Sequence, residues 1–227
     1  NGYWYAPWIP SAEGIHNLSA TIVQSGGKTT TASSTFEVSK NIDPADKDFS
    51  IMNGELHITP SQQTNYGEYV FPTHVGCFND ITMHYFHNCI GTCDDYDRVG
   101  YCRVKNYRGE WVELYRYVTP FGKECDDVLN VTDYTSVLQG LVEFEMFFQT
   151  WNGDGYNPTI NFTYTEGQPE YRYVDMNELW FGIYDFGDYA NKQPVPRVDY
   201  FFPEGTEKAN LKLISTGHNW SSGTNGA

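Results

Sequence analysis

Positive charge is scarce in this chain. Lys and Arg number 14 against 29 Asp and Glu, which gives a formal net charge of −15 at pH 7. Because nucleic-acid phosphates are bound by basic surfaces, this balance argues against a nucleic-acid partner. The excess of acid is typical of a soluble, secreted protein. Long hydrophobic runs are also absent: none approaches the roughly 20 residues of a membrane helix, so we expect no membrane span.

Runs rich in Ala, Leu, Glu and Lys are few, which argues against a helical protein. Aromatic residues instead make up 17% of the chain, with 18 Tyr, 14 Phe and 6 Trp, and there are 21 Gly and 11 Pro. This composition suits strands and turns. A length of 227 residues is enough for one or two domains with a substantial core.

The sequence has no initiating Met, signal peptide or transit sequence. It begins Asn1-Gly2-Tyr3, so we expect an N-terminus made by processing or by the choice of a fragment. The five cysteines indicate an oxidising compartment, and their odd number predicts that one is free or paired outside this chain. They are Cys77, Cys89, Cys93, Cys102 and Cys125.

Residues 1–39 predict three short strands, at 3–9, 17–24 and 30–38. The motifs in them are Trp8-Ile9-Pro10, His16-Asn17-Leu18-Ser19-Ala20, Gly26-Gly27-Lys28 and Thr35-Phe36-Glu37-Val38. Together they resemble the closing strands of a bacterial immunoglobulin-like domain, whose earlier strands are absent here. Residues 40–48 are polar, contain Pro44 and predict a linker.

A series of strands follows, at 81–87, 99–107, 111–118, 141–151 and 159–164. Strands at this spacing, with few helices, predict an all-β fold, either an antiparallel β-sandwich or a jelly roll. Residues 133–139 predict a short helix or turn that Asp133 could cap. After residue 168 too little chain remains for a second sandwich. Residues 169–227 therefore either wrap on the first domain or open a second one, with a strand expected at 209–214.

The segment Cys93-Asp94-Asp95-Tyr96-Asp97-Arg98 places three carboxylates and an arginine just before a predicted strand. A solvated loop explains such a cluster by itself, and a calcium loop is disfavoured because the twelve-residue pattern is absent. The nearby Cys89 favours a disulfide to Cys93, which would hold the segment rigid. A zinc site is disfavoured because His84 and His87 point to opposite faces of a strand.

The strand predicted at 141–151 has two different faces. Every second residue from Val142 to Thr150 forms an almost wholly apolar face that should belong to the core. The other face turns toward solvent or a cleft and carries Glu143, Glu145, Phe147, Gln149 and Trp151. Trp151 could stack on a sugar ring there, although half-buried packing explains this residue equally well.

Several further motifs lie between residues 88 and 151. They are Asn88-Cys89, Thr92-Cys93-Asp94, Tyr96-Asp97-Arg98, Val104-Lys105-Asn106, Gly109-Glu110-Trp111, Tyr117-Val118-Thr119-Pro120, Val131-Thr132-Asp133-Tyr134 and Thr150-Trp151. As a set they resemble the N-terminal jelly roll of the peptide-N-glycosidase F family, and weaker similarity reaches residue 217. The resemblance implies two adjacent eight-stranded jelly rolls with the active site between them. Residues 49–168 would form the first jelly roll and residues 169–227 the opening part of the second.

By this resemblance Asp97 corresponds to the catalytic aspartate. Substrate binding is assigned to Tyr96, Arg98, Gln149 and Trp151, and in the tail to His218 and Trp220. The implied reaction is hydrolysis of the amide bond between asparagine and the first N-acetylglucosamine of an N-glycan, without a cofactor. Gln149 stands where the family has a glutamate, so the raised pKa expected of two adjacent carboxylates is lost. A second catalytic glutamate would lie in the remainder of the second domain, beyond Ala227.

Two alternatives stay open. One is a non-catalytic carbohydrate-binding protein, suggested by Gln149 and the incomplete second jelly roll. The other is an adhesion protein, suggested by the immunoglobulin-like strands. A copper monooxygenase is disfavoured because the six His lack paired ligand spacing. As partners we expect N-glycosylated proteins or peptides. As location we expect secretion, the periplasm or the cell surface of a Gram-negative bacterium.

Overall fold

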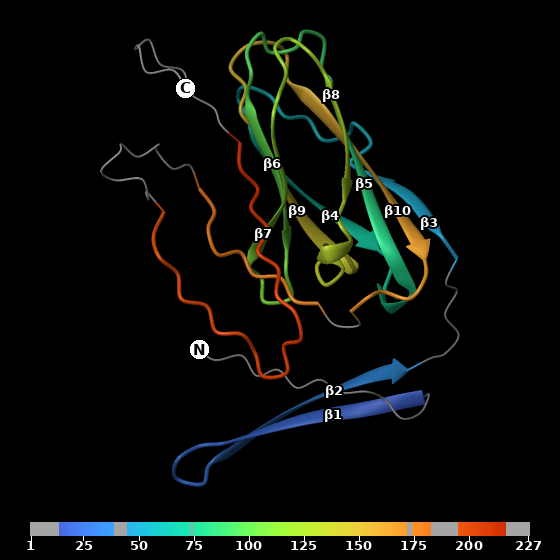
Figure 1. Ribbon diagram of the computed structural model, residues 1–227, viewed down its shortest axis with the longest axis vertical. Helices are drawn as coiled ribbons and strands as arrows, with labels where there is room; N and C mark the ends of the chain where they lie inside the picture. Colours follow the sequence, from blue (N-terminus) through green and yellow to red (C-terminus); the bar gives the residue numbers. More distant parts are fainter. Residues whose placement is uncertain (1–13, 39–44, 74, 172–173, 183–194, 217–227) are drawn as a thin grey trace. The chain divides into compact units, whose positions relative to one another are not determined.

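The computed structural model of the chain describes residues 14–38, 45–73, 75–171, 174–182 and 195–216, in two compact units, Asn1–Asp43 and Pro44–Ala227. In the first unit, β1 (Gly14–Val23) and β2 (Thr29–Val38) form an antiparallel hairpin (Figure 1). Gly26 and Gly27, both with positive φ, form its turn. The hairpin confirms the strands predicted at 17–24 and 30–38. The strand predicted at 3–9 lies outside the described residues, and the immunoglobulin-like assignment stays a prediction.

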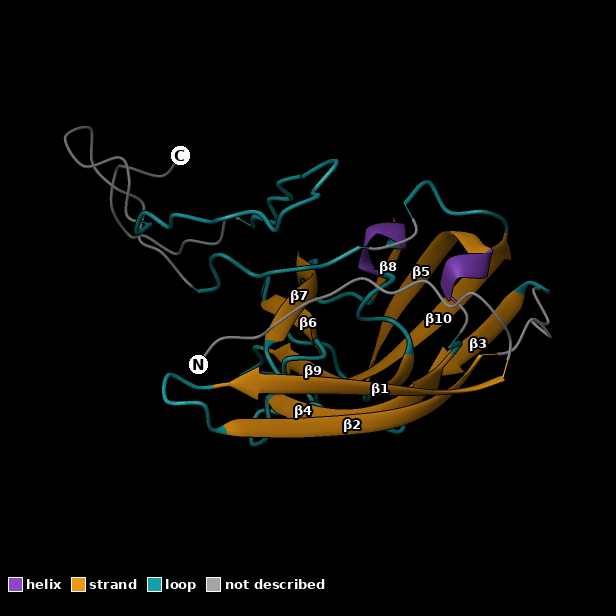
Figure 2. Cartoon of the chain, turned by 90° about the horizontal axis from the view of Figure 1, so that it is seen from below, coloured by secondary structure: helices purple, strands orange, loops and turns teal. Residues whose placement is uncertain are grey.

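The described residues of the second unit form an eight-stranded antiparallel β-sandwich, as the sequence predicts (Figures 1 and 2). One sheet has the strand order β3-β10-β5-β8 and the other has the order β4-β9-β6-β7. The bounds are β3 Lys47–Ile51, β4 Thr64–Phe71, β5 Phe78–Cys89, β6 Val99–Lys105, β7 Trp111–Val118, β8 Cys125–Asn130, β9 Gly140–Phe148 and β10 Tyr156–Glu166. The two short 3-10 helices are η1 (Val75–Cys77) and η2 (Thr132–Tyr134). No helix in the described part of the chain has the length and apolar character needed to cross a membrane.

The core lies between the two sheets, and the two-residue period of the strands builds it. On β9 the predicted apolar face is at most 2% exposed, at Val142, Phe144, Met146 and Phe148. Phe71 of β4 meets Phe162 of β10 across the core with ring centroids 5.0 Å apart. Burial of such a side chain contributes about 1.5–3 kcal/mol, so packing between the sheets stabilises strands that are far apart in sequence.

Some expected elements differ from the observed ones. The strands β3, β4 and β8 are additional to the prediction, and β3 begins at Lys47, inside the range expected to be a linker. The short helix or turn expected over 133–139 forms as η2 followed by a turn at 135–137, but Asp133 does not cap η2. The strand expected at 209–214 is not formed. There Leu211 and Leu213 are 76% and 84% exposed, and the described residues provide no neighbouring strand to pair with. That residues 169–227 open a second jelly roll therefore stays a prediction.

One core residue is unusual for its polarity. His87 on β5 is fully buried, with its ring centroid 4.8 Å from that of Phe148 and 5.1 Å from that of Tyr156. Neither ring nitrogen has a hydrogen-bond partner among the described residues. Burial favours the neutral imidazole and lowers the pKa of His87 to about 4. The fold therefore contains a group that must stay uncharged.

His87 is expected to make the sandwich sensitive to acid. Its folded pKa of about 4 lies below the value of 6.5 for an unperturbed histidine, so the unfolded chain binds a proton first. The free energy of unfolding is therefore unaffected by His87 above pH 6.5. It falls by up to about 3 kcal/mol as the pH drops toward 4, because the unfolded chain is then favoured by protonation of this histidine. We expect His87→Phe to remove this loss, as measured by chemical denaturation at neutral pH and near pH 4.5. The matched control is His57→Phe, at an exposed histidine. Equal acid-induced losses in the wild type and His87→Phe would contradict the assignment.

Candidate active site

The loop between β5 and β6 is held in place by a disulfide and by hydrogen bonds to a second loop. A disulfide joins Cys89 to Cys93, as predicted, while Cys77, Cys102 and Cys125 are free. The loop is also tied to the one between β9 and β10. The Thr92 amide donates to the Asp154 carboxylate at 2.9 Å, and the Asp154 amide donates back to the Thr92 carbonyl at 3.0 Å. Two loops that are distant in sequence thus form one rigid end of the sandwich.

Asp94 joins these two loops. Its Oδ2 accepts hydrogen bonds from the Thr150 hydroxyl at 3.1 Å and from the amides of Trp151 and Asn152, both at 3.0 Å. Its Oδ1 lies 3.0 Å from the Tyr96 amide and from Nη2 of Arg98. The side chain is fully buried. Burial opposes its ionisation, but the hydrogen bonds from Arg98 and the backbone amides outweigh burial and lower the pKa of Asp94 to about 2.

Arg98 lies under two exposed aromatic rings. Its guanidinium carbon is 4.4 Å from the ring centroid of Trp151 and 5.2 Å from that of Tyr96. Trp151 is 59% exposed and Tyr96 is 50% exposed, whereas Arg98 is only 7% exposed. Such cation–π contacts stabilise the rings in place. The backbone of Arg98 is fixed in turn by reciprocal hydrogen bonds with Thr119, both 2.7 Å long. The result is a positioned pair of ring surfaces open to solvent.

The predicted catalytic residue adjoins this arrangement. Asp97 is half-buried and lies between Tyr96 and Arg98, just before β6 begins at Val99. The backbone N–H of Gln149 donates to the backbone carbonyl of Val99 at 3.0 Å, which places Gln149 beside the start of β6. Its side-chain Oε1 is buried without a hydrogen-bond partner among the described residues.

The fold thus brings five of the predicted site residues to one end of the sheet β4-β9-β6-β7: Tyr96, Asp97, Arg98, Gln149 and Trp151. His218 and Trp220, the other two, lie outside the described residues. In the sequence, Asp94 stands out only as one member of an acidic cluster. The available signal is its spacing of four residues from Arg98, which suits an ion pair. The donors to its Oδ2 come from residues 56 to 58 positions away, which no local pattern reveals.

The metal sites considered from sequence find no support in the geometry. Both oxygens of Asp94 are occupied by protein donors. His84 is partly exposed on the outside of β5, where it pairs with Asp126, whereas His87 points into the core. This confirms that the two histidines lie on opposite faces. Among the described residues, no three or more His, Cys, Asp or Glu side chains are grouped to hold a metal ion.

The fold and the site together define a jelly-roll β-sandwich with a polar, aromatic-flanked site at one end. No protein-family model matches the chain. A curated relative, peptide-N(4)-(N-acetyl-beta-D-glucosaminyl)asparagine amidase F of Elizabethkingia miricola, is 32% identical over 166 residues, which cover 68% of this chain and 47% of the relative. Over the matched residues the chain belongs to the peptide-N-glycosidase F family.

Solved structures agree with this assignment. PNGase F, a glycosylasparaginase from Flavobacterium meningosepticum, matches with a TM-score of 0.53 and 28% identity over 56% of this chain and 44% of that one. A crystal structure of the peptide-N(4)-(N-acetyl-beta-D-glucosaminyl)asparagine amidase matches with a TM-score of 0.51 and 26% identity over the same shares. The chain thus spans about half the length of the relatives that it matches.

Proposed function

We propose that the protein hydrolyses the amide bond between asparagine and the first N-acetylglucosamine of N-glycans. One observation carries the proposal: Asp97, Arg98 and the rings of Tyr96 and Trp151 are gathered at one rigid, solvent-open end of a sandwich related to such an amidase. The substrates would be N-glycosylated proteins or peptides.

The proposed chemistry is the addition of one water to the amide. The water oxygen bonds to the carbonyl carbon, the carbon–nitrogen bond breaks, and the leaving nitrogen takes up a proton. The products are aspartate and a glycosylamine. Asp97 would bind the amide or the attacking water and assist proton transfer, which typically contributes about 10²–10⁴-fold. Arg98 would stabilise negative charge that develops on the amide oxygen. No cofactor takes part in this sequence of steps.

The proposal includes a second structural partner, further β structure that continues after Ala227. Its support is the unusual exposure of apolar side chains in residues 195–216, where Phe201 is 89% exposed and Phe202 is 60% exposed. The greater length of the matched relatives also supports it. We further propose secretion to the periplasm or the cell surface of a Gram-negative bacterium, a setting that suits the Cys89–Cys93 disulfide.

Incubation of a glycopeptide with the full-length protein in heavy-oxygen water tests the reaction class. We expect mass spectrometry to find aspartate, carrying the heavy oxygen, at the formerly glycosylated asparagine. A peptide without that glycan, treated in the same way, controls for spontaneous deamidation. Release that leaves one sugar on an unlabelled asparagine would show cleavage between sugars and contradict the proposal.

A second function is favoured by one observation. Gln149 cannot take up a proton where the family has a glutamate, yet the exposed rings of Tyr96 and Trp151 could still bind a sugar. A non-catalytic carbohydrate-binding or adhesion protein would bind the glycopeptide in the same experiment and leave it intact.

A further inference from the structure

The outer face of the sheet β4-β9-β6-β7 carries a second set of aromatic and charged side chains, far from Asp97. A shallow groove of about 300 Å³ is lined there by Tyr66, Gly67, Glu68, Lys105, Trp111, Glu143 and Phe144. The rings of Tyr66 and Trp111 lie with centroids 6.0 Å apart, and Tyr66 is 65% exposed. Lys105 and Trp111 are directly paired at the far end of β6 and β7.

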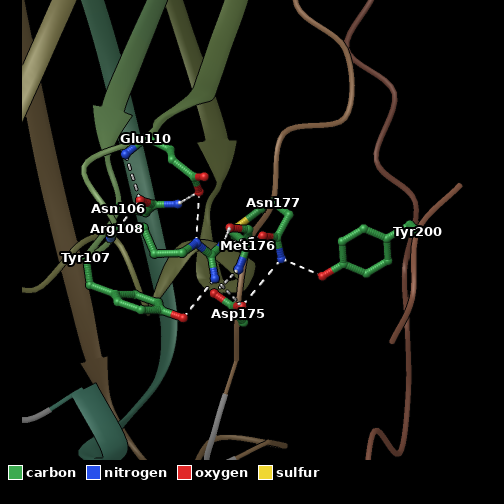
Figure 3. A network of polar contacts seen from close by, with 8 residues as sticks. All are labelled: Asn106, Tyr107, Arg108, Glu110, Asp175, Met176, Asn177 and Tyr200. Atoms are coloured by element: carbon green, nitrogen blue, oxygen red, sulfur yellow. Dashed lines mark hydrogen bonds and ion pairs between the residues drawn. The ribbon is translucent and has the colours of Figure 1, made fainter. Parts of the chain in front are cut away.

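A second groove of about 340 Å³ shares Trp111 with the first. Its other lining residues are Glu110, Asn177, Glu178, Leu179 and Tyr200. Its far wall is anchored by Arg108, which donates to Asp175 at 3.1 Å and to the Met176 carbonyl at 3.3 Å (Figure 3). Asn177 in turn donates to the Tyr200 hydroxyl at 2.7 Å (Figure 3). We call the two together the Trp111 grooves. Their volumes lie at the lower end of the range of small-molecule sites.

The exposed ring of Tyr66 is held in place. Tyr66 lies directly opposite Glu145 on the neighbouring strand. The negative charge of Glu145 raises the pKa of Tyr66. Glu145 is only 7% exposed and lies 3.5 Å from Arg103, which also approaches the Trp111 ring at 5.8 Å. A ring that is fixed but uncovered needs little ordering when a ligand binds.

The same face carries an unfavourable pair of acids. Glu68 and Glu143 lie directly opposite each other on β4 and β9, where like charges destabilise a sheet. Lys105 pairs with Glu143 and also approaches the Trp111 ring at 5.0 Å. Glu68 remains exposed beside the groove. The groove therefore offers carboxylate acceptors next to aromatic faces, which suits a ligand that has hydroxyl donors around an apolar ring face.

We propose that the Trp111 grooves bind neutral saccharides, one sugar ring on each side of Trp111. A pyranose has a face of C–H bonds that can pack on an indole or phenol ring, and hydroxyls at its edge that can donate to Glu68 and Glu143. Sugars that carry carboxylates are excluded, because the groove is rich in acids and the chain has a net charge of −15.

These grooves are separate from the candidate active site. Val99 and Lys105 are six residue steps apart along β6, which at the usual rise of a strand is about 20 Å. The proposal concerns binding alone, so it does not depend on amide hydrolysis.

Calorimetric titration of the full-length protein with chitobiose, mannobiose and lactose, each alone, tests the proposal. The background is Trp151→Ala, which removes the ring at the candidate active site. We expect at least one disaccharide to bind. Adding Trp111→Ala should weaken that binding by roughly tenfold or more. Adding Tyr66→Ala, at a mostly exposed position, should also weaken it and serves if the Trp111 variant does not fold.

Phe121→Ala is the matched control, since it removes an exposed ring that lines neither groove. Its affinity should equal that of the background. The proposal is overturned if no disaccharide binds once Trp151 is removed, because any sugar binding then belongs to the candidate active site. Unchanged affinity in both the Trp111 and Tyr66 variants would also overturn it.

Discussion

Asp94→Asn is expected to lower the free energy of unfolding by about 3–5 kcal/mol, because it leaves Arg98 buried without its counter-charge. Asparagine has the same shape but only one acceptor oxygen. The side-chain NH2 group of asparagine would therefore face one of the two sets of donors, and donors that face each other cannot form hydrogen bonds. One set comes from Arg98 and Tyr96, and the other from residues 150–152. Chemical denaturation near neutral pH measures the loss.

Asp95→Asn is the control for this change. It removes the same charge from the next residue along the chain, which is exposed. Surface substitutions of this kind usually change stability by no more than about 0.5 kcal/mol. Equal stabilities of the Asp94 and Asp95 variants would contradict the role of Asp94 in joining the two loops.

The pH dependence of this variant gives an independent test. The pKa of Asp94 is lowered from 3.8 to about 2, so its carboxylate stabilises the fold fully above pH 3.8. That contribution is lost as pH falls through 2, because the unfolded chain then takes up the proton first. The Asp94→Asn variant should not lose stability over this pH range. It should still lose the stability that depends on His87, which happens at higher pH. An identical acid limb below pH 3.8 in the wild type and the variant would contradict the assigned pKa.

Much of the fold follows from sequence periodicity. The strands β5 and β6 alternate clearly between buried and outward residues, and each was predictable for that reason. β8 was not, because its sequence Cys-Asp-Asp-Val-Leu-Asn is half polar, and it forms by pairing with β5. The strand expected at 209–214 has the right residues but no paired neighbour among the described residues. Strand formation depends on partners that a local pattern does not specify.

The candidate site is also only partly predictable from the sequence. Arg98 and Trp151 could be singled out by the family resemblance of the motifs that contain them, and the fold places the guanidinium carbon of Arg98 4.4 Å from the ring centroid of Trp151. The different environments of the three nearby aspartates could not be predicted from the sequence. Asp94 is buried, Asp95 is exposed and Asp97 is half-buried, although all three belong to one short acidic segment. The difference arises from the donors of residues 150–152, which reach Asp94 only in the folded chain.

The proposed hydrolysis makes a strong prediction for Asp97. Asp97→Asn keeps the shape of the side chain but removes the group that accepts a proton. We expect the rate of glycan release to fall by about 10²–10⁴-fold. Chemical denaturation of the same variant measures how much the free energy of unfolding changes, while the buried ion pair of Asp94 and Arg98 is left intact. A loss of activity in a variant that is still folded would be chemical and not structural.

The decisive measurement is the rate of glycan release from a denatured glycoprotein by the full-length protein, compared with its Asp97→Asn and Asp95→Asn variants at equal concentration. We expect the wild type and Asp95→Asn to release the glycan at similar rates and Asp97→Asn to be nearly inactive. Release by Asp97→Asn at the wild-type rate would contradict the role given to this carboxylate.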